Sequence, residues 1–161
     1  MVRIALILLV NDDGRIFVQL HDEQAATRPN RWSLPGGLIH DAETPAQSAR
    51  RLAAEQAGVP VDGEVRQFWS GFVPGHRVLT YAFWARTPAS DADIAARTDI
   101  SAAGVAPIAT GIVKVFLPGD EILNGRSFTI ASGYVVGRFV DSREYQALNP
   151  SLGPTRLPYL E

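Results

Sequence analysis

One short segment constrains the fold more than any other, because it specifies a helix together with both of its ends. Thr44 is a residue that favours the N-cap, and Pro45 falls at the first helical position, where its missing N–H costs nothing. Gln47 completes a Thr-x-x-Gln capping box. Gly58 stands where helices commonly stop in a left-handed conformation. The pattern predicts a helix from Pro45 to about Ala57.

Several residues in and around this helix have the spacing of a known sequence motif. They are Gly37, Glu43, Arg51, Glu55, Gly58 and Val59. The segment from Gly37 to Val59 resembles the Nudix box, G-x5-E-x7-R-E-U-x-E-E-x-G-U, in which U is aliphatic. The box is degenerate: Leu52 and Gln56 stand at two of its glutamate positions, and Ala53 stands at an aliphatic position. On these residues the chain resembles the Nudix hydrolase superfamily.

The order of the expected elements suits a layered α/β protein. Hydrophobic runs and caps predict strands at 4–10, 15–20, 32–34, 66–73, 77–86 and 112–117, and helices at 45–57, 127–140 and 142–148. A long connection is expected over 87–111, with a short helix around 91–97. This order predicts an α/β fold with a mixed sheet. The resemblance implies a Nudix-like α/β/α sandwich with a mixed central sheet.

The length and the proline content divide the chain into a domain and a tail. A chain of 161 residues can bury one sizeable hydrophobic core. We expect a single Nudix-like domain over 1–148. The segment 149–161 contains Pro150, Pro154 and Pro158, so we expect an extended C-terminal tail.

The resemblance implies hydrolysis of a nucleoside diphosphate-linked or related phosphoanhydride with Mg²⁺ or Mn²⁺. Such a cation neutralises phosphate charge and activates water, and it prefers oxygen ligands. Residues at i, i+3 and i+4 share a helix face, and positions 52, 55 and 56 carry Leu, Glu and Gln. The resemblance therefore implies a depleted metal site made of Glu55, Gly37 and Gln56, with weak or atypical activity.

Three charged residues of the segment are the predicted catalytic residues. Glu55 is the candidate metal ligand or general base. Arg51 and Glu43 resemble the family pair that ties the helix to the preceding loop, and a guanidinium suits bidentate pairing with a carboxylate. Gly37 resembles the glycine whose carbonyl assists the metal, while a turn with positive φ is an equal alternative for it.

Aromatic residues concentrated in three strands are the candidates for substrate binding. We predict that Trp69 and Trp84 stack on the substrate and that Arg77 binds phosphate, while the alternative for the aromatic residues is core packing. Strand alternation places Phe68 and Phe72 on one face and Trp69 on the other. Tyr81 and Phe83 are likewise expected to face away from Trp84.

The bulk composition excludes several classes of protein. A net charge of −2 favours a small-molecule substrate or ligand over a nucleic acid polymer. The absence of cysteine excludes disulfides and thiolate zinc sites. The apolar run Ile4 to Val10 is too short to span a membrane and is expected to be a buried strand. We expect a cytoplasmic protein, with which the absence of cysteine is compatible. The resemblance also implies a homodimer.

Two alternatives to a hydrolase follow from the degenerate box. The first is a non-catalytic Nudix domain that binds a nucleotide-like ligand or a partner, and it is motivated by Leu52 and Gln56. The second is a repurposed, metal-independent biosynthetic enzyme, which the lost ligands and the aromatic strands suggest.

Overall fold

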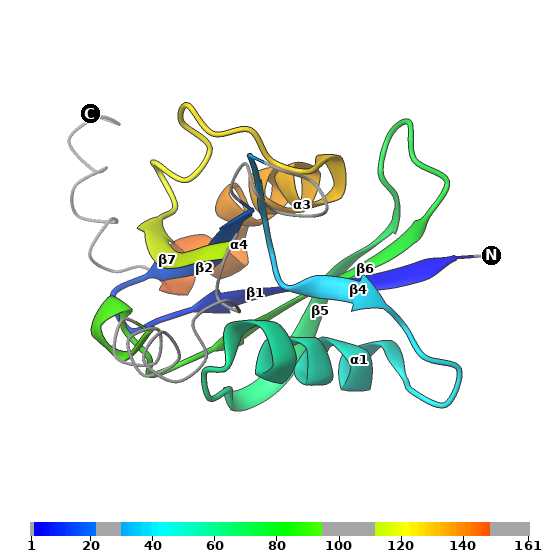
Figure 1. The fold of residues 1–161 in the computed structure, drawn as a ribbon, viewed down its shortest axis with the longest axis horizontal. Helices are drawn as coiled ribbons and strands as arrows, with labels where there is room; N and C mark the ends of the chain where they lie inside the picture. The colour runs from blue at the N-terminus through cyan, green and yellow to red at the C-terminus, as the bar shows by residue number, and fades with distance from the viewer. Residues whose placement is uncertain (1, 22–29, 95–111, 149–161) are drawn as a thin grey trace.

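A mixed β-sheet lies between two helical layers in the computed structural model, which describes residues 2–21, 30–94 and 112–148 (Figure 1). The strands are β1 (Arg3–Val10), β2 (Arg15–His21), β3 (Arg31–Ser33), β4 (Gly36–Leu38), β5 (Asp62–Phe72), β6 (Leu79–Arg86) and β7 (Ile112–Pro118). Helix α1 (Pro45–Leu52) covers one face, and α3 (Ile130–Val140) and α4 (Arg143–Leu148) cover the other (Figure 1). The expected α/β fold with a mixed sheet is confirmed.

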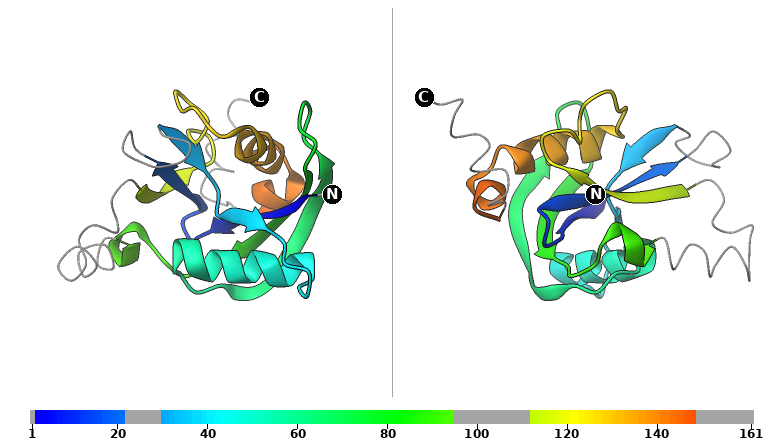
Figure 2. Two further views of the ribbon diagram at one scale, coloured as in Figure 1. Left: turned by 45° about the vertical axis from the view of Figure 1, so that its right-hand side comes forward. Right: turned by 90° about the vertical axis from the view of Figure 1, so that its left-hand side faces the viewer.

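The central strand β1 joins the two halves of the sheet. It runs parallel to β6 and antiparallel to β2 and β4. β5 pairs with β6 as an antiparallel hairpin, and β7 extends the sheet along β2. β1 and β2 pair around Val10 and Ile16 and then diverge, so that β4 lies beside β1 while β3 lies beside β2 (Figure 2). The divergence opens one end of the sheet.

Alternation along the strands builds two cores on opposite faces of the sheet. The residues packed on the α1 side include Ala5, Ile7, Leu9, Phe17, Phe83 and Phe116. Those packed on the α3 side include Leu6, Leu8, Val18, Trp84, Phe139 and Tyr145. Tyr81 packs with the first set, so the expected opposition of Tyr81 and Phe83 to Trp84 is confirmed.

The alternation predicted for β5 is wrong at one point. Phe68 and Trp69 both pack on the α3 side, with ring centroids 5.1 Å from Phe139 and 5.3 Å from Tyr134 respectively. The register of β5 against β6 shifts between Gln67 and Trp69. A β-bulge adds a residue to one strand, and this reverses the faces of the residues that follow it.

The helix predicted from Pro45 to Ala57 forms, but its last turn is not α-helical. Residues Ala53–Ala57 form a π-helical turn, η1. The Gly58 N–H donates to the Ala53 carbonyl, 3.0 Å away across five residues, and Gly58 has the expected left-handed conformation with φ 67°. Both bonds of the capping box between Thr44 and Gln47 are present.

The remaining expected elements differ in their ends or lie outside the description. α3 begins at Ile130 rather than residue 127. Residues 91–94 are helical, and 95–97 lie outside the described residues, as does the expected tail 149–161. No helix in the described ranges is long and apolar enough to cross a membrane.

Candidate functional site

A groove of about 1360 Å³ lies at the open end of the sheet. β4 and η1 line one side, and the paired ends of β2, β3 and β7 line another. The hairpin between β5 and β6 and the segment that leads into α3 complete the lining. The divergence of β1 and β2 therefore places the C-terminal end of the predicted box helix beside three strand ends.

Glu43 and Arg51 form a two-bond clamp between the loop after β4 and α1. Arg51 Nε donates to Glu43 Oε2 at 2.8 Å, and Arg51 Nη2 donates to Glu43 Oε1 at 3.1 Å. The Ser48 hydroxyl donates to Glu43 at 2.6 Å, and Arg51 also donates to the Leu38 carbonyl at 3.1 Å. The Arg51 and Ser48 hydrogen bonds lower the pKa of Glu43 to about 2. The clamp joins the loop, the helix and β4.

Glu55 is the one predicted catalytic residue whose carboxylate reaches the groove. Its side chain is 57% exposed, and its Oε1 accepts from Arg51 Nη1 at 3.1 Å. Arg51 thus bridges Glu43 and Glu55, so the structure brings all three predicted catalytic residues together. Glu55 remains accessible to a molecule in the groove because more than half of its side chain is exposed despite the ion pair.

Leu52 occupies the first of the three helix positions, 52, 55 and 56, at which the resemblance implies metal ligands, and its side chain is packed in the core. Its side chain is only 4% exposed and belongs to the core between α1 and the sheet. A Cβ added to Gly37 would lie 3.1 Å from Leu52 Cδ2, so the glycine makes room for the leucine. Gly37 lies in β4 without a positive φ, so the alternative of a turn at this glycine is wrong.

Gln56 binds the backbone of β4 through both ends of its amide. Its Oε1 accepts from the Gly36 N–H at 3.0 Å, and its Nε2 donates to the Gly36 carbonyl at 2.8 Å. The same oxygen accepts from Gln19 Nε2 at 3.1 Å. An amide has both a donor and an acceptor, whereas a carboxylate only accepts. Gln56 is therefore matched to the two polar groups of one backbone residue.

The residues at this position do not fit a magnesium site. Magnesium favours near-octahedral oxygen ligands with carboxylate charge. Glu55 supplies a carboxylate, Leu52 supplies no donor atom, and the Gln56 oxygen already accepts two hydrogen bonds. Within the described ranges, no three His, Cys, Asp or Glu side chains gather to hold a metal. Of the predicted ligands Glu55, Gly37 and Gln56, only Glu55 presents a charged donor to the groove.

The three residues predicted to bind substrate lie away from the groove lining. Trp69 packs on Tyr134 of α3 and lies under Arg138, whose guanidinium carbon is 5.3 Å from the ring centroid. Trp84 is 9% exposed and packs on Phe139. Arg77 is exposed in the β5–β6 hairpin, and its neighbours on both sides line the groove instead. The geometry gives the two tryptophans the alternative role, core packing.

Polar residues at the ends of apolar strands are the lining residues that sequence reasoning missed. They are Gln19, His21, Arg31, Ser33 and Lys114. A signal for them exists, because apolar strands that end in polar residues commonly approach solvent or a cavity. The pairing of the three strands could not be read from local sequence, so the shared position of these residues was not predicted.

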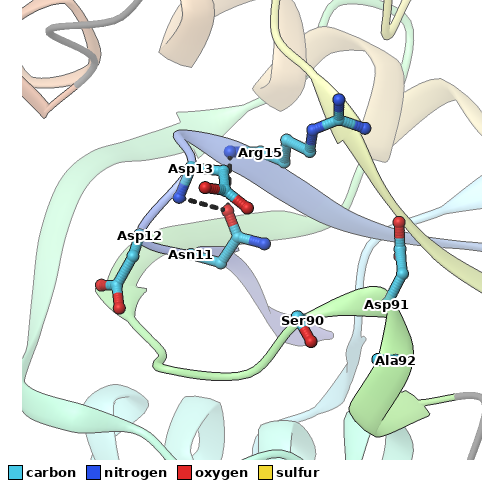
Figure 3. Close-up of a pocket in the computed structure, with 7 residues that line it drawn as sticks. All are labelled: Asn11, Asp12, Asp13, Arg15, Ser90, Asp91 and Ala92. Carbon is cyan, nitrogen blue, oxygen red and sulfur yellow. Dashed lines mark hydrogen bonds between the residues drawn. The ribbon is translucent and has the colours of Figure 1, made fainter.

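A second, smaller hollow of about 640 Å³ lies at the other end of β1 and is lined by Asp12, Asp13 and Asp91 among others (Figure 3). The Asn11 side chain accepts from the backbone N–H groups of Asp13 and Arg15, both at 3.0 Å. Asp91 accepts from the Phe116 N–H at 2.8 Å. The three carboxylates point in different directions (Figure 3), so they do not converge on one site.

Comparisons with known proteins identify the family and support the fold. A family model described as NUDIX domain matches residues 1–128. A structure from a study of MutT from Aliivibrio salmonicida and Vibrio cholerae is similar, with 16% identity, a TM-score of 0.59, and coverage of 86% of this chain and 96% of that chain. The crystal structure of the MutT protein from Methanosarcina mazei Go1 is also similar. It has 16% sequence identity and a TM-score of 0.56, and the match covers 87% of this chain and 92% of that chain. At this identity the likeness concerns the fold alone. No curated protein sequence matches the chain.

Proposed function

The chain belongs to the NUDIX domain family, and from that premise we propose that it binds a phosphorylated, nucleotide-like small molecule in the groove without magnesium-dependent turnover. The observation that carries the proposal is the Gln56 amide on Gly36. It converts a position that would supply charge to a cation into one that holds β4 against the helix. The groove has a volume of about 1360 Å³ without a complete set of metal ligands, so a ligand has room to bind there without a metal.

A phosphoanhydride hydrolase is the second candidate, and the position of Glu55 favours it. The carboxylate lines the groove and is held by Arg51 at 3.1 Å. In this role Glu55 would accept a proton from a water molecule as the water oxygen bonds to phosphorus. The bond from phosphorus to the bridging oxygen would break, and that oxygen would leave with the second phosphate. Arg51 would act on the reaction by orienting the carboxylate.

The two candidates make different predictions for one panel of compounds. Binding and product release are measured with ADP, ADP-ribose and a nucleoside triphosphate, in EDTA, Mg²⁺ and Mn²⁺. We expect the wild-type protein to bind at least one compound, seen as saturable heat and a raised Tm, and to release no product. Metal-dependent release that Glu55→Gln abolishes would replace this proposal with the hydrolase.

A matched variant separates a lost metal site from an unsuitable groove. The double variant Leu52→Glu/Gln56→Glu restores the two carboxylates of the box. Product release by this variant, with none from the wild-type protein, would support a binding domain whose groove still accepts phosphoanhydrides.

The homodimer, the cytoplasmic location and the domain limit at residue 148 stay predictions. Size-exclusion chromatography with light scattering tests the homodimer.

A further inference from the structure

We propose that Arg31, His21 and Lys114 hold the phosphate groups of the ligand, and that the Arg31 guanidinium and the Lys114 ammonium supply the positive charge that a divalent cation would otherwise supply. The inference rests on the proposed binding function of the groove, and it assigns the ligand a diphosphate or similar polyanion. The three residues come from three strands, and none belongs to the box segment.

The register of the strands places these side chains on one face. His21 of β2 is opposite Arg31 of β3. Gln19, two residues earlier on β2, is opposite Ser33 on one side and opposite Lys114 of β7 on the other. Directly opposite residues in antiparallel strands have their side chains on the same face, as do residues two apart along a strand. The three basic residues therefore form one cluster with Gln19 and Ser33.

This face changes from apolar to basic toward the groove. Phe17 and Phe116 lie on the same face one step further inside, where both are fully buried and their rings meet edge to face with centroids 5.7 Å apart. Arg31 is exposed, and His21 and Lys114 are half-buried. Lys114 is also the only lysine of the chain. The core thus ends where the cluster begins, and the cluster opens into the groove.

The charge of the groove favours an anion. Its basic or titratable lining residues are His21, Arg31, His76 and Lys114, and Glu55 is its only acidic one among the described residues. Glu55 shares Arg51 with Glu43, so one negative charge remains beside the two permanent positive charges of Arg31 and Lys114. Guanidinium and ammonium groups are the common ligands of phosphate oxygens, and the guanidinium binds them through two parallel N–H groups. A polyanion in this groove therefore has cationic partners without a metal ion.

A second element of the lining contributes charge of the same sign. The N-terminal end of α3, residues 129–132, lines the same groove. Thr129 makes no side-chain cap there. The N-terminal end of a helix carries a partial positive charge from its backbone N–H groups. The α3 end therefore adds partial positive charge to the lining of the groove.

The test is calorimetric titration of the full chain with inorganic pyrophosphate and with ADP, each in EDTA. We expect both to bind the wild-type protein. Lys114→Gln and Arg31→Gln should each weaken pyrophosphate binding roughly tenfold, the size expected for losing one hydrogen bond to a charged group. Arg143→Gln removes one positive charge from exposed α4 and should leave binding unchanged. Lys114→Arg keeps the charge and should retain most of the affinity.

The outcomes separate this inference from the proposed function. If ADP binds in EDTA and the Lys114 and Arg31 variants bind pyrophosphate as well as Arg143→Gln does, the cluster is not the phosphate site, while the binding function stands. If pyrophosphate binds only when Mg²⁺ or Mn²⁺ is present, the cation carries the charge and the inference is overturned. If neither compound binds under any condition, the proposed function fails as well. Tm values for each variant verify folding.

Discussion

The two parts of the segment from Gly37 to Val59, before Leu52 and from Leu52 onward, have different structural roles in this molecule. In the first part, Glu43 and Arg51 make a two-bond ion pair, and Thr44 is part of a complete capping box. In the second part, Leu52 is buried in the core and Gln56 binds the backbone of β4. The first part keeps the pattern of the box, and the second part keeps Glu55 but has packing and neutral hydrogen bonds in place of its two other carboxylates.

The difference teaches that the fold-supporting and metal-supporting parts of such a segment are physically separable. The Glu43–Arg51 clamp acts on the chain's own loop, helix and strand, so these contacts support the fold whether or not an ion is bound. Three clustered carboxylates would repel one another without a cation. Leu52 and Gln56 at two of these positions avoid that repulsion. Leu52 adds a core side chain, and the Gln56 amide makes two hydrogen bonds to the Gly36 backbone, here called the Gln56 clasp.

The largest expected effect on stability comes from removing the buried side chain of Leu52. Leu52→Ala removes a buried side chain and leaves a cavity against Gly37, so the free energy of unfolding should fall by about 2–5 kcal/mol. Urea unfolding followed by circular dichroism measures it. Leu38→Ala is the matched control, because Leu38 is 60% exposed and should change stability by less than about 0.5 kcal/mol. A loss below 1 kcal/mol for Leu52→Ala would contradict the core role.

A smaller loss of stability is expected when the Gln56 clasp on Gly36 is disrupted. Gln56→Glu places an acceptor against the Gly36 carbonyl, where the amide now donates at 2.8 Å. The expected loss is about 1–3 kcal/mol in EDTA, because the Gly36 carbonyl loses its donor. Gln47→Glu makes the same chemical change at the capping box, where the side chain only accepts from the Thr44 N–H, so its stability should be unchanged. Equal stability of the two variants would show that the clasp adds nothing.

The smallest effect is a pH dependence, and it tests the clamp between Glu43 and Arg51. The Arg51 and Ser48 hydrogen bonds lower the pKa of Glu43 from 4.5 to about 2 in the folded protein. A carboxyl with a depressed pKa stabilises the fold above its unfolded-state pKa and loses that contribution as pH falls through the folded value. The Tm advantage of wild type over Glu43→Gln should therefore be constant near neutral pH and shrink between about pH 4.5 and 2. A constant advantage down to pH 2 would contradict the role of the charge.

The sequence predicts those features of the fold whose determining contacts are themselves local. The start of α1 and its stop at Gly58 depend on residues within a few positions, and both were predicted. The faces of Phe68 and Trp69 were not, because the bulge in β5 arises from its pairing with β6. The π-helical turn before Gly58 was also missed, and no residue type in that turn signalled it.

The sequence by itself determined the family, the mixed α/β class and the carboxylates that are missing from the box, because fixed spacing and side-chain chemistry are properties of the chain. Only the tertiary structure decided what the replacing residues do. Leu52 becomes core through its contact with Gly37, and Gln56 finds its partners 20 residues away on Gly36. The basic cluster exists only because β2 pairs with β3 and β7 in one register. Such long-range pairing is set by the packing of the whole sheet, which no local pattern encodes.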